Sequence, residues 1–341
     1  MLTTTLPSEG DEKCSSSSLQ KKINSQKDVV HFKTKSPAYK DIVSYVDSLC
    51  EHIQGTGNRI LNHRYVIENH VFKRCSSFLD ELARCCDETD LNLAQSAGTL
   101  RFGHVAFRTW FDKMRLMCQD FTDDLLGERF GLYKEELSTY LSESFGNRMR
   151  IDYGTGHELS FLIFTMGLSN VVEIRENGGD KDAEVETEKL RGFVKTHGWD
   201  ILSLFAHKYL RLCRKLQTKF RLEPAGSRGV YNMDDFQFLP FLFGAAQLSG
   251  VKHILTSEFH LAESVEDYKR DYIFFEAVDF ILNNKRGPFN EHSYTLWGFT
   301  NLGSWDNIYR RIRGKFKDEI LEPFPIVQHF LFGRHILRWE G

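Results

Sequence analysis

Apolar residues recur every three or four positions through most of this chain, which is the spacing of helices with one buried face. Such a pattern follows Ser36-Pro37, and proline is well accepted in the first turn of a helix. The other stretches with helical spacing are 60–86, 105–119, 133–145, 156–174, 199–221, 236–248, 266–284 and 305–321. Alternating apolar and polar runs with hairpin turns are lacking, as are repeats of about 20 to 50 residues. The pattern therefore predicts an all-α fold.

Two polar stretches interrupt the helical pattern. Residues 1–30 are rich in Ser, Lys and Thr, which is typical of a disordered tail. Residues 175–192 are acidic, interrupted by glycine and poor in apolar side chains, which favours a surface loop. Further on, Asp235 is expected to open an apolar helix that Pro240 interrupts. We therefore expect a single helical domain over 31–341.

The composition excludes several classes of protein. Of the 341 residues, 41% are apolar and 27% are charged, which allows a buried core and rules out global disorder. A net charge of -3 argues against a nucleic-acid partner, and the chain lacks the run of about 18 apolar residues that would predict a membrane span. The N-terminal stretch also lacks the apolar segment of a signal peptide. The seven cysteines include no CxxC pair, so we expect reduced thiols in the cytoplasm or nucleus.

The segment Arg150-Ile-Asp-Tyr-Gly-Thr-Gly-His-Glu158 carries the most specific candidate chemistry. Its Gly-Thr-Gly turn precedes an apolar helix, where backbone N–H groups and the helix dipole favour an anion. It lacks the lysine of a Walker motif, the third glycine of a dinucleotide fingerprint and the second histidine of a zincin. What remains is a general anion site to which Arg150 could supply a bidentate phosphate contact. Thr155 either donates to a phosphate oxygen or caps the helix, and a simple capped helix start is the alternative to the whole site.

His157 and Glu158 form a pair with catalytic character. In the alternative interpretation, Glu158 complements the helix dipole from the first turn, and His157 packs locally. The chain shows neither a Walker lysine nor a kinase catalytic loop, which disfavours a free-standing kinase or NTPase.

Four further segments accompany 150–158 in a fixed order. They are Arg101-Phe-Gly-His-Val-Ala-Phe-Arg-Thr-Trp110, Glu223-Pro-Ala-Gly-Ser-Arg-Gly-Val230 with Asp234-Asp-Phe-Gln-Phe-Leu-Pro-Phe241, Gly287-Pro-Phe-Asn-Glu-His-Ser293 and Phe324-Pro-Ile-Val-Gln-His-Phe330. Together, over about 36–334, they resemble the signature segments of the phosphotyrosyl phosphatase activator family, the activators of the type 2A serine/threonine protein phosphatase. The chain departs from the family at Tyr231-Asn232-Met233, where relatives have Trp-Gly-Leu.

The resemblance implies an all-α fold of core, linker and lid parts, with a pocket between them that holds ATP with magnesium. The residues that would contact the nucleotide are Arg150, Thr155 and Gly156 and, from the C-terminal side, Gln328, His329 and Phe330. Without the resemblance, Phe330 would be interpreted as a core residue, although an aromatic ring also suits an adenine base.

The resemblance also assigns a metal site and a partner surface. Gly229 and Asp235 would serve the magnesium ion, which usually takes few protein oxygens besides phosphate and water. Asp235 alone would be interpreted as a helix cap. Tyr231 would be an interface anchor, and Glu291 would lie on the side that faces the phosphatase.

Two functions of different class follow from the resemblance. In the first, the protein binds the phosphatase catalytic subunit, alone or with its scaffold subunit, around a cleft that holds ATP–magnesium, and promotes the active, metal-loaded conformation. In the second, it is a peptidyl-prolyl cis-trans isomerase for a proline-containing segment, a reaction whose barrier of about 18–20 kcal/mol needs no nucleophile. A nucleotide-dependent chaperone or scaffold without isomerase activity is the alternative. No nucleic-acid or membrane partner is expected, and the expected location is the cytoplasm, with the nucleus as a second site.

Overall fold

The computed structural model describes residues 19–56, 65–92, 103–178, 186–226 and 232–340 of the chain. Its α-helices are α1 (Gln26–Thr34), α2 (Pro37–Ile53), α3 (His70–Glu88), α4 (Ala106–Leu126), α5 (Gly131–Ser142), α6 (Thr155–Asn177), α7 (Thr187–Ser203), α8 (Leu210–Phe220), α9 (Leu239–Leu248), α10 (Ala262–Tyr268), α11 (Ile273–Asn284), α12 (Phe289–His292), α13 (Tyr294–Phe299), α14 (Trp305–Lys315) and α15 (Phe324–Val327). Short 3-10 helices cover Glu128–Phe130, Glu143–Phe145 and Thr300–Leu302, and π-helical turns cover Leu204–Tyr209 and Phe316–Leu321. The fold is therefore all-α, as the sequence predicts.

The strands within the described ranges are only two residues long and serve to join remote segments. They are β1 (Gln20–Lys21), β2 (Asp152–Tyr153), β3 (Glu223–Pro224) and β4 (Leu331–Phe332). β1 runs antiparallel to β4, with Gln20 opposite Phe332. β2 runs parallel to β3, with Asp152 opposite Glu223. The first pair brings the beginning and the end of the described chain together, and the second joins two of the signature segments.

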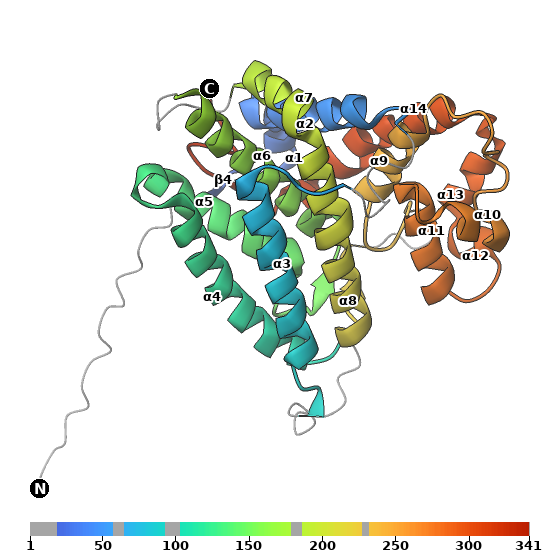
Figure 1. Ribbon diagram of the computed structural model, residues 1–341, viewed down its shortest axis with the longest axis horizontal. Coiled ribbons are helices and arrows are strands. Elements are labelled where there is room, and N and C mark those ends of the chain that lie inside the picture. The colour runs from blue at the N-terminus through green and yellow to red at the C-terminus, as the bar shows by residue number, and fades with distance from the viewer. Residues whose placement is uncertain (1–18, 57–64, 93–102, 179–185, 227–231, 341) are drawn as a thin grey trace, which may run out of the picture.

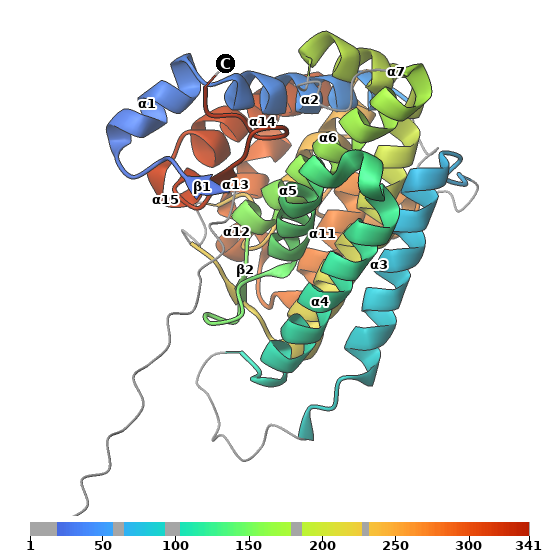
Figure 2. The same ribbon diagram turned by 90° about the vertical axis from the view of Figure 1, so that its left-hand side faces the viewer.

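The long helices pack side by side around one core. Figures 1 and 2 both show α3 and α4 next to each other, while α9 to α13 form the opposite end of the molecule in Figure 1. The most extensive helix contacts are those of α2 with α7, of α4 with α5, and of α9 with α11 and α14. The buried apolar side chains form one connected cluster. The division into core, linker and lid parts stays a prediction.

Helix α6 lies in the interior of the fold. Its residues are buried on nearly every face from Leu159 to Val172, which is typical of a helix surrounded by core rather than lying on a surface. The polar groups in this stretch find partners: the Ser169 hydroxyl lies 3.1 Å from that of Tyr45, and the Asn170 amide donates to Tyr133 at 3.1 Å. α6 ends at Gly178, whose left-handed conformation is the usual helix stop. The helix expected at 156–174 is confirmed.

A π-helical turn, Leu204–Tyr209, connects α7 to α8 without a break. It places the Tyr209 ring flat against Phe161, with 3.8 Å between the ring centroids. The Tyr209 hydroxyl donates to the Ser144 carbonyl at 2.8 Å and lies 2.8 Å from the Tyr153 hydroxyl. Single π turns are frequent near functional sites, and this one contacts strand β2 through the hydroxyl groups of Tyr209 and Tyr153.

Two of the expected boundaries at polar stretches are wrong. The disordered tail does not extend to residue 30, because β1 and α1 lie within it and Ile23 and Val29 are buried in the core; residues 1–18 lie outside the described residues. The acidic loop predicted at 175–192 is also shorter. α6 continues to Asn177 and α7 starts at Thr187, so Glu176 and Glu188 belong to helix ends, while 179–185 lie outside the described residues.

Other helices start later than the apolar spacing indicates. α3 begins at His70 rather than near residue 60, because Asn69 caps it by accepting the Val71 N–H at 3.0 Å. α9 begins at Leu239 rather than at 236, so Pro240 lies in its first turn and does not interrupt it. The stretch 266–284 is divided into α10 and α11.

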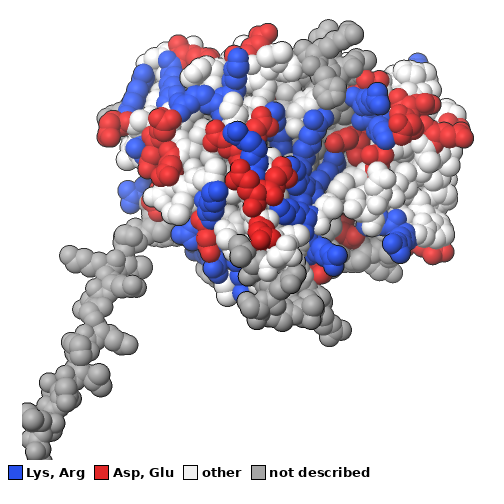
Figure 3. All heavy atoms as spheres, turned by 60° about the horizontal axis from the view of Figure 1, so that its bottom comes forward, with Lys and Arg blue, Asp and Glu red and all other residues white. Residues whose placement is uncertain are grey.

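The surface carries charges of both signs. Figure 3 shows acidic and basic side chains interspersed over the visible face. Ion pairs between neighbouring helices, such as Lys208 of the π turn with Asp80 of α3, produce such a mixed surface. Within the described ranges, no helix combines the length and apolar character needed to cross a membrane. The described cysteines are unpaired and buried, and burial raises the pKa of the Cys86 thiol to about 12.

Candidate functional site

The start of α6 is the point at which the signature segments meet. Strand β2, directly before α6, pairs with β3 of the segment that begins at Glu223. The Glu223 N–H donates to the Ile151 carbonyl at 3.1 Å, and the Ala225 N–H donates to the Tyr153 carbonyl at 2.8 Å. Two segments more than 60 residues apart in the sequence are therefore held backbone to backbone (β2 at 152–153 and β3 at 223–224).

The segment around Gly103 joins the same junction. Ile151 has a left-handed backbone, with φ of 54°, which is strained for a β-branched residue. A Cβ atom on Gly103 would collide with the Ile151 side chain, so glycine is needed at that position. The next residue, His104, donates its N–H to the Phe220 carbonyl at 2.7 Å. Strain of this kind, held in place from several sides, is common at functional sites.

Helix α6 begins without a side-chain cap. Gly154 is the N-cap residue, and no side chain accepts from the first turn. The interpretation of Thr155 as the cap is therefore wrong, because Thr155 is already the first helical residue. A Cβ atom on Gly154 would lie 2.8 Å from the Ala225 carbonyl, whereas one on Gly156 would meet nothing within 4 Å. Gly154 thus allows close packing, and Gly156 faces open space beside the N–H groups of the helix start.

Glu158 links α6 to α9. Its side chain is 1% exposed, and its Oε2 accepts the N–H groups of Phe238 at 2.8 Å and Leu239 at 3.0 Å. Glu158 therefore caps a helix other than its own, which differs from both interpretations of the sequence. Neither the catalytic nor the dipole role explains these bonds. The signal was absent from the local sequence because the bonded N–H groups lie 80 and 81 residues further along the chain.

The protonation of Glu158 leads to a prediction about stability. Burial raises its pKa to about 8, against the opposing effect of the two N–H bonds. A carboxyl whose pKa is higher in the folded state contributes most below its unfolded value of about 4.5, and this contribution is lost as the pH rises through 8. When the pH is raised from about 6 to about 8.5, Glu158→Gln, which cannot ionise, is expected to lose less unfolding free energy than the wild type. Urea unfolding at the two pH values tests this, and equal losses would contradict it.

Arg150 and two histidines line the edge beside the start of α6. Arg150 is half exposed, and its Nε donates to Asp152 at 2.6 Å. His157 lies with Nδ1 2.6 Å from the Glu143 carbonyl and its ring beside Tyr153. Burial lowers the pKa of His157, and the positive charges of Arg150 and His329 lower it further.

His329 reaches this edge from the C-terminal side. The pKa of its imidazole is lowered by desolvation and then by the nearby charges of Arg150 and Lys21. His329 itself is exposed, while Gln328 is half-buried and donates to the Pro325 carbonyl at 3.2 Å. The structure therefore brings His329 to Arg150, as the resemblance implies, and adds Lys21 of β1, which sequence reasoning missed.

Phe330 occupies a different environment from the other predicted nucleotide contacts. Its side chain is 5% exposed, and its ring packs edge-on against Phe32 at 5.9 Å between centroids. Phe332 lies on the same Phe32 ring from another side. The side chain of Phe330 is thus part of the core and not a free platform for an adenine base.

The acidic side of the site lies directly before α9. Asp234 Oδ2 accepts the N–H groups of Phe236 and Gln237, each at 3.2 Å. Asp235 Oδ2 lies 2.6 Å from Lys285 Nζ, so the segment that precedes Gly287 meets the segment 234–241 here. Burial raises the pKa of Asp234, and the neighbouring Asp235 charge raises it further, against the effect of Lys285.

Of the three remaining predicted residues, the structure describes only Glu291. Glu291 is exposed on the short helix α12. Gly229 and Tyr231 lie outside the described residues. Among the residues that are described, no three His, Cys, Asp or Glu side chains gather as a ready metal cluster. A magnesium site at Asp235 would therefore depend on phosphate and water for most of its ligands.

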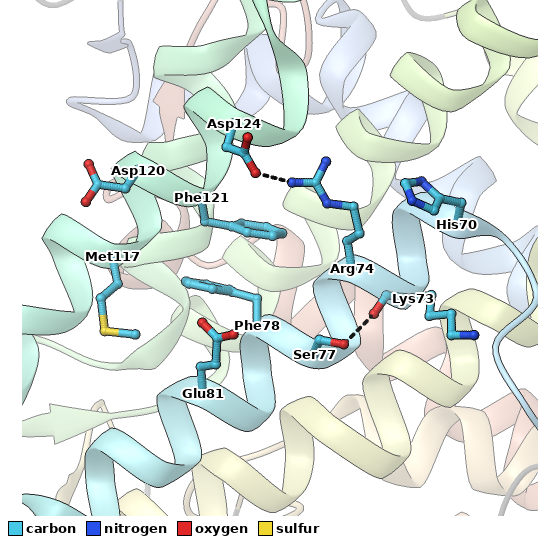
Figure 4. Close-up of a pocket in the computed structure, with 10 residues that line it drawn as sticks. All are labelled: His70, Lys73, Arg74, Ser77, Phe78, Glu81, Met117, Asp120, Phe121 and Asp124. Atoms are coloured by element: carbon cyan, nitrogen blue, oxygen red, sulfur yellow. Dashed lines mark hydrogen bonds and ion pairs between the residues drawn. The ribbon is translucent and has the colours of Figure 1, made fainter.

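A separate groove of about 710 Å³ lies between α3 and α4. Figure 4 shows Phe78 and Phe121 stacked across it, with 4.1 Å between ring centroids, and Arg74 of α3 bridged to Asp124 of α4. Arg74 is thus already paired with a carboxylate, and none of the signature segments lines the groove. The groove does not share the chemistry of the α6 junction.

Comparison with known proteins identifies the family of this chain. A family model described as "Phosphotyrosyl phosphate activator (PTPA) protein" matches residues 19–339. The chain belongs to the phosphotyrosyl phosphatase activator family. Over 299 residues it is 35% identical to the serine/threonine-protein phosphatase 2A activator of Drosophila melanogaster, covering 88% of this chain and 68% of that protein.

Other members of the phosphotyrosyl phosphatase activator family match over a similar length. The probable serine/threonine-protein phosphatase 2A activator 1 of Dictyostelium discoideum is 33% identical over 315 residues, covering 92% of this chain and 88% of that protein. A crystal structure of the PP2A phosphatase activator Ypa1 PTPA1 superposes with a TM-score of 0.77 at 25% identity, covering 96% of this chain and 97% of that chain. The family and the all-α fold predicted from the signature segments are therefore confirmed.

Proposed function

We propose that this protein activates a type 2A serine/threonine protein phosphatase by binding its catalytic subunit around a cleft that holds ATP–magnesium. The observation that carries the proposal is the convergence of the signature segments on one junction, between the start of α6 and the start of α9. The relatives that match nearly the whole chain bear the name of phosphatase 2A activators, which supports the same activity here.

The phosphate side of the proposed site is formed by Arg150, Thr155 and Gly156. The uncapped start of α6 offers N–H groups and the positive end of a helix dipole. Arg150 makes one bond to Asp152 through Nε, and a guanidinium has further donors that suit phosphate oxygens. Gln328 and His329 would close the site from the C-terminal side, with the backbone at Phe330 beside them. This donor set fits an anionic ligand.

Asp235 would hold the magnesium ion, together with the carbonyl of Gly229. The Asp235 carboxylate is 25% exposed and forms an ion pair with Lys285. It therefore fits a metal ion only if it can bind the metal and Lys285 together. Asp234 is tied to backbone N–H groups and would act at longer range. When bound, magnesium would neutralise charge on the nucleotide phosphates, and Asp235 would hold it on the α9 side of the site.

In this proposal the chain acts by binding, not by covalent chemistry. It would bind one conformation of the phosphatase more tightly than the others and so increase the population of the active, metal-loaded form. Glu291 on α12 and Tyr231 would contact the catalytic subunit, alone or with its scaffold subunit. The exposed position of Glu291 suits such a contact. The cytoplasmic and nuclear location stays a prediction.

A pull-down with purified phosphatase catalytic subunit tests the proposal. We expect this chain to retain the subunit, and to retain more of it when ATP and magnesium are both present. An ATP-only and a magnesium-only arm separate the contribution of the complex from that of each component. The absence of retention in every arm would overturn the proposed function.

Prolyl isomerase activity, implied by the resemblance, is a separate proposal. Rotation about an X-Pro bond requires a desolvated surface that twists the amide. An isomerase assay on a proline peptide without phosphatase tests it directly. A rate equal to that of the uncatalysed peptide would leave the non-enzymatic chaperone or scaffold as the remaining interpretation.

A further inference from the structure

Every backbone N–H group from Phe236 to Leu239 donates to the carboxyl group of an acidic side chain. Asp234, directly before this segment, accepts from Phe236 and Gln237 at 3.2 Å. Glu158, from the first turn of α6, accepts from Phe238 at 2.8 Å and from Leu239 at 3.0 Å. The next residue is Pro240, which has no N–H group. Two of the four N–H groups at the start of α9 are thus capped by the preceding residue Asp234, and the other two by Glu158 of the remote helix α6.

The bonds from Glu158 are enclosed in the core. Its side chain is 1% exposed, and its second oxygen, Oε1, is buried without a hydrogen-bond partner among the described residues. Water does not screen bonds in such a place, so they are strong and costly to break. A buried carboxyl group therefore joins the start of α6 directly to the start of α9.

Glu158 lies between the two sides of the proposed nucleotide site. On α6 it follows Thr155 and Gly156 within one helical turn, so it moves with the phosphate side. Its bonded partners, Phe238 and Leu239, follow Asp234 and Asp235 in one short capped segment. A shift of either side is transmitted to the other through these two hydrogen bonds.

We propose that Glu158 is a positioning residue that couples the phosphate side of the nucleotide site to its metal side, so that magnesium strengthens nucleotide binding through this link. The inference rests on the proposed function, because it requires that the site binds ATP and magnesium. Glu158 itself does not touch the ligand, since both of its bonds point to the backbone of α9.

The test compares nucleotide affinity with and without magnesium by isothermal titration calorimetry. The ratio of the two affinities measures the coupling between the sides. For Glu158→Leu and for Glu158→Asp, whose side chain is one methylene shorter, we expect that ratio to fall by about tenfold or more relative to the wild type. Glu158→Gln keeps an oxygen that accepts both N–H bonds and is expected to retain most of the coupling.

Asp200 of α7 provides a matched control. Its carboxylate is 2% exposed and accepts two successive N–H groups of a remote segment, from Glu68 at 2.8 Å and Asn69 at 3.1 Å. Asp200→Leu removes the same kind of buried link away from the signature segments. We expect Asp200→Leu to lower the melting temperature and to leave unchanged the ratio of the nucleotide affinities with and without magnesium.

A readout that does not depend on a bound ligand completes the experiment. Hydrogen exchange at the Phe238 and Leu239 amides is expected to be faster in Glu158→Asp than in the wild type and unchanged in Asp200→Leu. If the wild type binds ATP with magnesium coupling and the Leu and Asp variants keep that coupling, the inference is wrong while the proposed function stands. If the wild type binds no ATP in either condition, the proposed function fails, and this inference fails with it.

Discussion

Replacing Arg150 or Asp235 with alanine is expected to weaken ATP-dependent activation of the phosphatase by about 10- to 100-fold at limiting ATP, while the fold persists. A hydrogen bond to a charged group contributes about 1.5–3 kcal/mol, which corresponds to this range. Lys285 keeps Asp234 at 3.9 Å after Asp235 is removed, whereas Arg150→Ala leaves the buried Asp152 without its guanidinium partner, so the melting temperature of that variant is measured beside its activation. Activation by each variant, titrated with ATP at fixed magnesium, measures the effect.

Arg148 gives the matched control for Arg150. It lies two positions before Arg150 and pairs with Asp112 of α4 at 2.6 and 2.8 Å. This ion pair is exposed and lies away from the proposed site, so Arg148→Ala is expected to activate normally. Normal activation by both Arg150→Ala and Asp235→Ala would contradict the assignment of the nucleotide site. Equal losses in all three variants would point to a general effect of charge.

Replacing Gly244 with valine is expected to destabilise the fold by about 3 kcal/mol or more. A Cβ atom at this position would overlap the backbone nitrogen of Phe274 and lie 2.6 Å from its Cα atom. These are backbone atoms of α11, which no side-chain rotation can move away. The helices α9 and α11, which pack extensively on each other, would have to separate.

The effect of Gly244→Val can be separated from ordinary helix propensity. Gly192, in the middle of α7, has nothing within 4 Å of a Cβ atom. Gly192→Ala is therefore expected to raise stability by about 0.5–1 kcal/mol, because alanine loses less backbone freedom on folding. Urea unfolding followed by circular dichroism measures both variants. A Gly244→Val protein as stable as the wild type would show that α9 and α11 can move apart freely.

The spacing of apolar residues was sufficient to predict the fold class and most of the helices. α2 begins at Pro37 and α6 covers the range expected after Gly156, because both positions combine a strong start signal with a long apolar period. α1 was missed, since its few apolar residues, such as Val29 and Phe32, are spread among polar ones in a region of polar composition. Its stability comes from packing against residues near the other end of the chain, including Phe330 and Phe332.

The candidate site was predicted in part. The residues alone indicated a general anion site at the start of α6, and the signature segments added Asp235 and His329. The function of Glu158 could not be predicted, since it depends on N–H groups that reach it only after folding. Phe330 shows the same limit, because an aromatic residue in a motif can border a ligand or fill the core, and only the packing around Phe32 decides between them.

The pairing of β1 with β4 also has a mechanical consequence. The segment after β4 is held in the core, because the N–H groups of Arg334, His335 and Ile336 donate to Glu136 and the fully buried Ile336 packs against Gly167 of α6. A pulling force from the C-terminal side therefore loads these contacts before it reaches β4, whereas a force from the N-terminal side reaches β1 soon after residue 19. Tension on the N-terminal side would thus draw Lys21 from the edge of the Arg150 site before His329.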